Sequence, residues 1–220
     1  MTASDAAPNV AGTNRWVDVE HARAYLTNRD SIPFRAEGMA VLAEFVPAEV
    51  GRVLDLGTGD GILMELIRDL RPAGHGVACD FSDEMLGRAS ERFADDDLVD
   101  VVRQDLDDPL PTAWGSFDLV VSSFAIHHVS DARKRTLYGE VFDRLSPGGT
   151  FLNLEHVASV SPALHDEFLA AIGVTPERDD PSNQLAPVAD QLGWFREIGF
   201  ADVDCHWKWR ELALLAGTRP

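Results

Sequence analysis

Acidic and glycine residues follow an apolar run in a pattern that suits a ligand bound through backbone groups. The stretch Val53-Leu-Asp-Leu-Gly-Thr-Gly-Asp-Gly61 places three glycines directly before a segment of helical periodicity. Glycine permits close approaches that a Cβ would forbid, and the next helix offers unpaired N–H groups. Asp55 and Asp60 add negative charge, which favours a cationic or hydroxyl-rich ligand over a pyrophosphate. The spacing G-x-G-x-G also differs from the dinucleotide fingerprint G-x-G-x-x-G.

Two further aspartates stand at or near the ends of the next apolar runs. Asp80 lies nineteen residues after Gly61, where doubly wound folds place an acid that binds ribose hydroxyls. Asp105, in Val102-Arg-Gln-Asp-Leu106, ends the third run, where a carboxylate can accept from an exocyclic amino group. Each aspartate alone is more typical of a turn or a helix cap than of a ligand site. The prediction of a nucleoside site therefore depends on their combination with the glycine bend.

A histidine pair follows the fourth apolar run, residues 117–122, and a second polar pair ends the fifth. Because the unperturbed pKa of histidine lies near neutrality, His127 and His128 are candidate general bases, together with Glu155 and His156. A structural role for one of the paired histidines stays open. No HxxxH or HxH spacing indicates a metal site, and we predict none.

These side chains need a sheet whose strands end at one edge. Short apolar runs alternate with helix-period segments, which predicts parallel strands with crossover helices, and two closely spaced final runs require an antiparallel last strand. We predict an α/β fold with a doubly wound, mostly parallel seven-stranded sheet, an antiparallel last strand and helices on both faces. The predicted strands are 52–56, 76–80, 99–103, 117–122, 150–155, 201–209 and 211–216. Helices are predicted at 18–27, around 39–46, after the glycine bend, around 85–93 and 137–145, and at 162–172 and 186–198. The residues Ser146–Gly149 are predicted to end the helix at 137–145. The segment 177–184 is predicted to be a surface loop.

Composition narrows the range of partners. The 220 residues are 45% hydrophobic, which fits one substantial domain, and a net charge of −18 disfavours nucleic acid. The one basic cluster, Arg133–Arg135, is predicted to be a solvated helix face. The two cysteines, Cys79 and Cys205, show no disulfide spacing, and the N-terminus lacks a signal-peptide pattern, so we expect a cytoplasmic protein without a membrane anchor.

At this point the chain resembles the class I S-adenosylmethionine-dependent methyltransferases, with a Rossmann-like domain over 33–220. The segment 1–32 is then expected to begin as a mobile stretch and continue as a helix that caps the cofactor site. Ile32-Pro-Phe-Arg35 is similar to a cofactor-contacting segment of carboxy-S-adenosylmethionine synthase, although Arg35 stands where that enzyme has tyrosine, and Ser123 where it has asparagine. The resemblance implies S-adenosylmethionine as cofactor and S-adenosylhomocysteine as product. The residues that it implies for cofactor binding are Arg35, Asp55, Gly57, Thr58, Gly59, Asp80, Phe81, Met85, Asp105, Leu106, Ser122 and Ser123.

The predicted function is methyl transfer to a small-molecule acceptor by in-line displacement, for which the protein must mainly align donor and acceptor. Three alternatives stay open: a transferase using a modified cofactor or an RNA acceptor, an NAD-binding oxidoreductase, and a module that binds the cofactor without turnover. The acceptor pocket is expected from the least patterned segments, 14–35, 127–133, 155–195 and 207–210. A homodimer is among the arrangements that the sequence allows.

Overall fold

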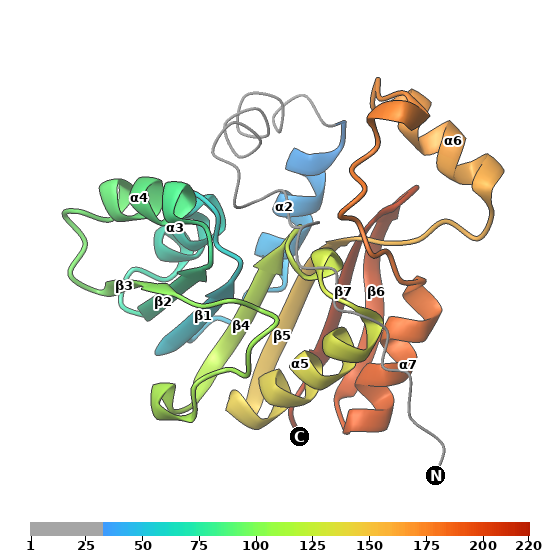
Figure 1. The fold of residues 1–220 in the computed structure, drawn as a ribbon. Coiled ribbons are helices and arrows are strands. Elements are labelled where there is room, and N and C mark those ends of the chain that lie inside the picture. Colours follow the sequence, from blue (N-terminus) through green and yellow to red (C-terminus); the bar gives the residue numbers. More distant parts are fainter. Residues whose placement is uncertain (1–32) are drawn as a thin grey trace, which may run out of the picture.

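A computed structural model describes residues 33–220, and the predicted helix over 18–27 lies outside the described residues. A single seven-stranded sheet in the order β3-β2-β1-β4-β5-β7-β6 forms the centre of this part of the chain (Figure 1). The strands are β1 (Arg52–Leu56), β2 (His75–Asp80), β3 (Val99–Arg103), β4 (Phe117–Ser123), β5 (Leu145–His156), β6 (Ala201–Trp209) and β7 (Leu212–Thr218).

The topology confirms the predicted fold class. The pairs β1–β2, β1–β4, β2–β3 and β4–β5 are parallel, whereas β7 lies between β5 and β6 and is antiparallel to both. The chain winds outward from β1 to β3 and then returns to β4 on the other side of β1. The carboxyl ends of β1 and β4 therefore border the crevice in which open α/β sheets bind ligands.

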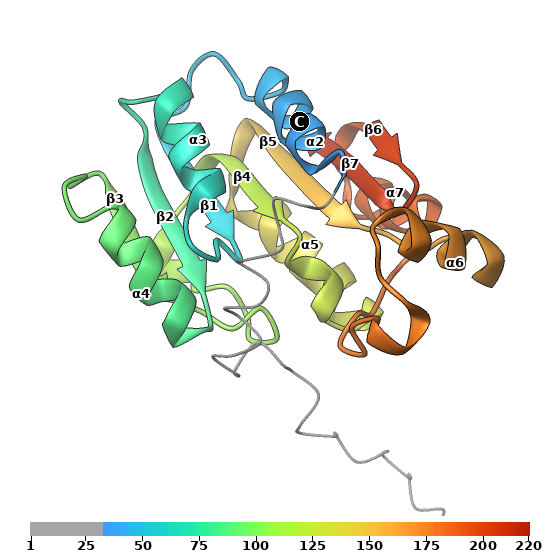
Figure 2. The ribbon, with the colours of Figure 1, turned by 90° about the horizontal axis from the view of Figure 1, so that it is seen from above.

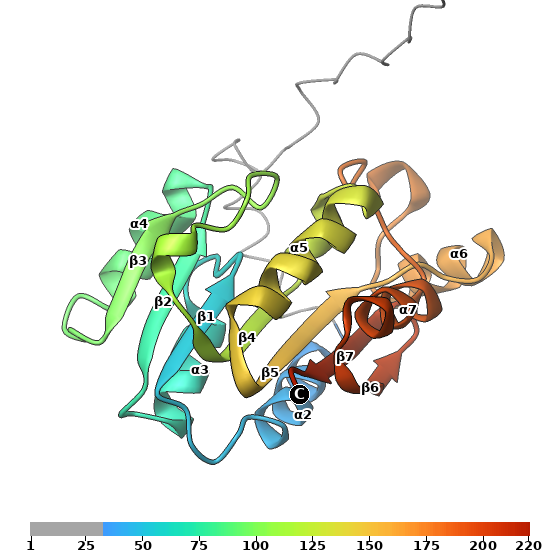
Figure 3. The ribbon, with the colours of Figure 1, turned by 90° about the horizontal axis from the view of Figure 1, so that it is seen from below.

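Helices cover both faces of the sheet (Figures 2 and 3). On one face, α2 and α3 contribute Leu42 and Ile67 to a buried cluster, and on the other, α5 and α7 contribute Tyr138 and Phe195. Burying both faces requires strands that are largely apolar on each side, which explains the prevalence of Val, Leu and Phe in β1 and β4. The helices are α2 (Arg35–Glu44), α3 (Ile62–Leu70), α4 (Asp83–Arg92), α5 (Asp131–Arg144), α6 (Pro162–Ala171) and α7 (Val188–Ile198).

Two local predictions were wrong, and a third holds with one exception. The fifth strand begins at Leu145, because Ser146–Gly149 is drawn into the sheet, where Gly148 and Gly149 exchange backbone hydrogen bonds with Arg219. Lys134 is fully buried, although the cluster around it was expected to be solvated. The predicted surface loop 177–184 is confirmed except at Ser182, which is buried and contacts His128. No helix in the described part of the chain is long and apolar enough to cross a membrane.

Candidate active site

A cavity of about 890 Å³ opens at the carboxyl ends of β1, β2 and β4 and is bordered on its other sides by α2 and α3. Of the twelve residues predicted to bind the cofactor, all but Ser122 line it. The eleven are Arg35, Asp55, Gly57, Thr58, Gly59, Asp80, Phe81, Met85, Asp105, Leu106 and Ser123. The parallel strands thus bring together side chains that are scattered over ninety residues of sequence.

The glycine bend after β1 is shaped by close packing on one side and open space on the other. Gly57 has φ +68°, and a Cβ there would lie 2.2 Å from the Cβ of Ala125, so a side chain cannot fit. Gly59 has φ +57°, and a Cβ there would meet nothing within 4 Å. The bend therefore presses against the segment after β4 while its second glycine leaves backbone exposed to the cavity.

Asp55 is a buried carboxyl group in the cavity wall. Its Oδ2 accepts a 2.6 Å hydrogen bond from Oγ1 of Thr58, and its Oδ1 has no hydrogen-bond partner among the described residues. Burial, opposed by the Thr58 hydrogen bond, raises the pKa of Asp55 to about 7. A buried polar atom without a partner costs free energy, which a ligand group that pairs with it would recover.

Asp80 joins the end of β2 to the glycine bend. Its Oδ2 accepts from the backbone N–H of Gly59 at 2.9 Å, and its Oδ1 accepts from that of Ser82 at 2.9 Å. Burial raises the pKa of Asp80, while these N–H donors oppose the shift. The carboxyl group is therefore held in one orientation at the cavity wall.

The loop that carries Asp105 and Leu106 is fastened by an arginine that the sequence analysis did not select. Nε of Arg133 donates to the carbonyl of Leu106 at 2.6 Å, and Nη2 donates to that of Asp108 at 2.8 Å. Glu140 pairs with the same guanidinium at 2.6 and 2.8 Å and accepts from the N–H of Leu110. Arg133 belonged to the cluster predicted to be solvated, and only its helical spacing of seven residues from Glu140 hinted at a pairing.

The end of β4 has one serine in the cavity wall and one behind it. Ser123 lines the cavity, whereas Ser122 is fully buried and donates to the carbonyl of Leu56 at 2.8 Å. The next residue, Phe124, has φ +54°, and the guanidinium of Arg35 lies 4.6 Å from the centre of its ring. Positive φ is strained for an aromatic residue, and such strain often accompanies a functional site.

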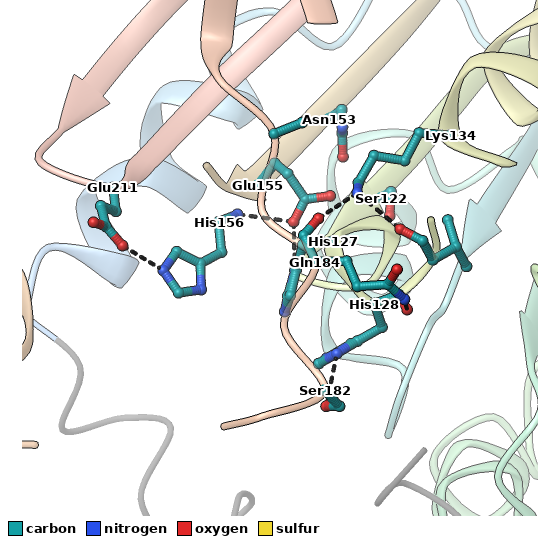
Figure 4. Close-up of polar contacts among 12 residues, drawn as sticks. Ser122, His127, His128, Lys134, Asn153, Glu155, His156, Ser182, Gln184 and Glu211 are labelled. Carbon is teal, nitrogen blue, oxygen red and sulfur yellow. Dashed lines mark hydrogen bonds and ion pairs between the residues drawn. The ribbon is translucent and has the colours of Figure 1, made fainter. Parts of the chain in front are cut away.

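The two candidate histidines occupy different positions (Figure 4). His128 lines the cavity, whereas His127 and Glu155 lie behind the wall, with Nδ1 of His127 2.6 Å from Oε1 of Glu155. Burial lowers the pKa of His127 well below its ordinary value and raises that of Glu155 to about 7. His156, the remaining candidate, points its Nε2 at Glu211 at 2.9 Å. Of the four candidates, His128 alone belongs to the cavity lining.

Within residues 33–220, no group of three or more histidine, cysteine, aspartate or glutamate side chains is arranged to hold a metal ion. Among the described residues of the segments expected to form the acceptor pocket, 33–35 and 128–129 line the cavity, and residues 14–32 lie outside the described part of the chain.

A sequence profile described as a methyltransferase domain matches residues 53–149, which run from β1 to the start of β5. The demethylmenaquinone methyltransferase of Clavibacter sepedonicus is 30% identical over 181 residues, which cover 76% of this chain and 72% of that protein. The chain belongs to the class I S-adenosylmethionine-dependent methyltransferases.

Two other proteins show how far the similarity reaches. An uncharacterised methyltransferase of Mycobacterium tuberculosis is 35% identical over 127 residues, which cover 58% of this chain and 60% of that protein. An O-methyltransferase family protein from Burkholderia thailandensis shares the fold, with a TM-score of 0.72 and 23% identity over 93% of this chain and 61% of its own. This methyltransferase thus spans about three fifths of the length of both proteins.

Proposed function

We propose that this methyltransferase binds S-adenosylmethionine in the cavity and transfers its methyl group to a small-molecule acceptor. The observation that carries the proposal is the convergence of Asp55, Asp80 and Asp105 on one cavity at the carboxyl ends of consecutive strands. When bound, S-adenosylmethionine supplies an electrophilic methyl group on a positively charged sulfur. The acidic wall suits this charge, and a net charge of −18 makes a nucleic-acid acceptor unfavourable.

The residues present fit this cofactor. Gly59 leaves room where a Cβ would stand, and Asp55 offers a buried oxygen without a partner among the described residues. In our assignment, Asp80 binds the ribose hydroxyls, and Asp105 with Leu106 borders the adenine. Arg35 binds the carboxylate of the methionine portion, because it is the single arginine or lysine among the described residues that line the cavity. Phe81, Met85 and Ser123 complete this proposed set, and Ser122 is withdrawn from it.

For the chemical step we assign His128 as the residue that contacts the acceptor. His127 and Glu155 support it from behind, since the rings of the two histidines lie 4.0 Å apart. We also propose that residues 1–32 complete the cavity, because its wall includes Pro33, the first residue described. Truncating this segment is expected to weaken cofactor binding.

We infer a reducing compartment such as the cytoplasm from the cysteines, of which Cys79 is buried and Cys205 is half-buried, both as free thiols. A homodimer remains a prediction that light scattering of the purified protein checks.

Calorimetry tests the cofactor assignment first. We expect micromolar binding of S-adenosylmethionine and S-adenosylhomocysteine and no binding of NAD. Preference for NAD, or no binding of either sulfur compound, would overturn the proposal in favour of the oxidoreductase alternative. Incubation with methyl-labelled cofactor and matched phenol, amine and carboxylate acceptors then distinguishes an enzyme with a small-molecule acceptor from a module that only binds.

A further inference from the structure

Glu211, in the turn between β6 and β7, is a buried carboxylate that faces two histidines from other elements. Nε2 of His156, at the end of β5, lies 2.9 Å from its Oε2 (Figure 4), and Nδ1 of His165, on α6, lies 3.0 Å from its Oε1. Burial alone would raise the pKa of Glu211, but hydrogen bonds from His156, Ser159 and His165 outweigh it and lower the pKa. Glu211 therefore accepts hydrogen bonds as an ionised carboxylate.

The second ring nitrogen of His165 faces another carboxylate. Its Nε2 lies 3.3 Å from Oδ2 of Asp179, in the loop between α6 and α7. Because an ionised carboxylate can only accept, both contacts are hydrogen bonds only when both ring nitrogens carry a proton and the ring is a cation. Among the described residues, Glu211 and Asp179 are the charged groups that face this ring, and His156 lies on the far side of Glu211. Partial burial opposes the charge, yet the two carboxylates outweigh it and raise the pKa of His165 above its ordinary value of 6.5.

Loss of one proton would make the two contacts of His165 unequal. Glu211 is fully buried, so the loss of one of its donors costs more than the loss of the donor to Asp179, whose side chain is 30% exposed. The remaining proton therefore belongs on Nδ1, and the lone pair of Nε2 faces the Asp179 carboxylate. α6 keeps its place through Phe168, which is buried in one cluster with Leu212 of β7. A rise in pH thus removes the contact between α6 and the loop and leaves the contact between α6 and the sheet.

Asp179 organises the loop to which it belongs. Its Oδ1 accepts from the backbone N–H of Asp180 at 2.9 Å and from the side-chain amide of Asn183 at 3.4 Å. Oδ1 of Asp180 accepts in turn from the backbone N–H and the hydroxyl of Ser182. A cation at His165 therefore holds the segment 179–183 through a single carboxylate.

The same loop reaches the wall of the cavity. Ser182 is buried, and its Oγ lies 3.2 Å from Nδ1 of His128, which lines the cavity. The far end of the loop is held independently, because the backbone N–H of Gln184 donates to the carbonyl of His127 at 2.8 Å. Release from α6 would therefore loosen 179–183 beside the cavity wall and leave Gln184 in place.

We propose that His165 is a pH-sensitive latch, which as a cation fastens the loop 179–183 to α6 and as a neutral ring releases it beside the cavity wall. This device is separate from methyl transfer and needs no cofactor. Because the pKa of His165 is higher in the folded than in the unfolded chain, the stabilisation is fully present below about pH 6.5 and is lost as the pH rises through the raised value.

Nuclear magnetic resonance of the full-length protein with nitrogen-15-labelled histidine tests the charge. The His165 signals are assigned by their absence in His165→Gln. We expect both ring nitrogens to be protonated at pH 6, a titration midpoint above 6.5 and, at pH 9, a single proton on Nδ1. Asp179→Asn, which can still accept a hydrogen bond but carries no charge, should lower the midpoint. A neutral ring at pH 6, or an unchanged midpoint in Asp179→Asn, would overturn the proposal.

Hydrogen exchange tests the release of the loop. After correction for the intrinsic exchange rate at each pH, the protection of the amides of Asp180, Ser182 and Asn183 should fall about 2- to 5-fold between pH 6 and pH 9, as expected for one partly exposed pair. The amide of Gln184 should keep its protection. In His165→Gln, whose side chain does not titrate, the protection of all four amides should be independent of pH.

The control is His206→Gln, which removes an exposed histidine of β6. It should retain the native pH dependence in the loop. Equal pH dependence in His165→Gln and in the native protein, or a native loop whose protection does not change with pH, would show that His165 is not a latch. Because both measurements are made without S-adenosylmethionine, failure of the cofactor to bind would contradict the proposed function alone.

Discussion

Oδ2 of Asp80 accepts a hydrogen bond from the backbone N–H of Gly59, so the end of β2 holds the glycine bend that follows β1. One carboxylate thus shapes the bend and faces the cavity in which we place the ribose. We expect Asp80→Ala to weaken S-adenosylmethionine binding by about 1–3 kcal/mol, or roughly 5- to 150-fold, because the hydroxyls and the Gly59 N–H lose their acceptor. Calorimetry measures the loss.

The control for this prediction is Asp83→Ala, which removes an exposed carboxylate three residues later, paired with Arg103. Its affinity should stay within about twofold of the native value, as expected for a surface pair. Equal weakening by both variants would mean that general charge, and not the position of Asp80, determines binding.

The titration of Asp55 predicts that the affinities for S-adenosylmethionine and for S-adenosylhomocysteine depend differently on pH. With a pKa of about 7, its ionised fraction rises from roughly a tenth at pH 6 to roughly nine tenths at pH 8. The affinity for the positively charged S-adenosylmethionine should therefore rise about tenfold over this range relative to that for uncharged-sulfur S-adenosylhomocysteine. In Asp55→Asn, the ratio of the two affinities, measured by calorimetry at each pH, should no longer change with pH. A native ratio independent of pH would contradict a contribution of the Asp55 charge to binding the positively charged sulfur.

The residues whose position in the cavity wall the sequence predicted are those set by local pattern and by one topological rule. Apolar runs that hold Asp55 or lead up to Asp80 and Asp105 marked three strand ends, and parallel pairing brings such ends to one edge of the sheet. Ser122 and Ser123 show the limit of this reasoning. Successive strand residues point to opposite faces, so the two could not share one cavity, and which of them faced it depended on the register with β1.

The residues that sequence misplaced depend on distant parts of the chain. Lys134 looked solvated because its helix carries a run of charges, yet its amine donates to the carbonyl of Val129 and to that of Gln184, fifty residues later in the chain. Ser182 stood in a polar stretch typical of a surface loop, and its burial follows only from the packing of that loop on His128. Local composition does not report such long-range pairings, so these residues became visible only in the folded chain.

Glu155 makes the stability of the protein depend on pH in an unusual direction. Burial raises its pKa from 4.5 to about 7, so between these values the folded chain binds a proton that the unfolded chain has released. Its contribution to stability is therefore present at low pH and is lost as pH rises from about 4.5 to about 7. The buried His127 and His128, whose pKa values are lowered, act in the opposite direction. The prediction therefore concerns the difference in the free energy of unfolding between the native protein and a variant at Glu155.

Glu155→Gln removes this titration. The free energy of unfolding of the variant, relative to that of the native protein, should rise by about 1–3 kcal/mol between pH 5 and pH 7.5. Urea denaturation at the two pH values measures it. The exposed Glu91→Gln should show no such change, and a native-like pH dependence in Glu155→Gln would show that the buried carboxyl is already ionised at pH 5.

Arg133 predicts that cofactor affinity depends on a residue outside the cavity. Its guanidinium donates to the carbonyls of Leu106 and Asp108 while pairing with Glu140 through two hydrogen bonds. A lysine cannot reproduce this planar set of donors, so Arg133→Lys should loosen the loop over 105–110 that borders the proposed adenine site. We expect cofactor affinity to fall about 3- to 10-fold and backbone amides of 105–110 to exchange faster with solvent, as followed by hydrogen exchange.

Arg135→Lys on the same helix, where the exposed arginine pairs with Glu197, should leave both measurements unchanged. If Arg133→Lys accelerated exchange without weakening binding, the loop would be stabilised by Arg133 but would not contribute to the cofactor site.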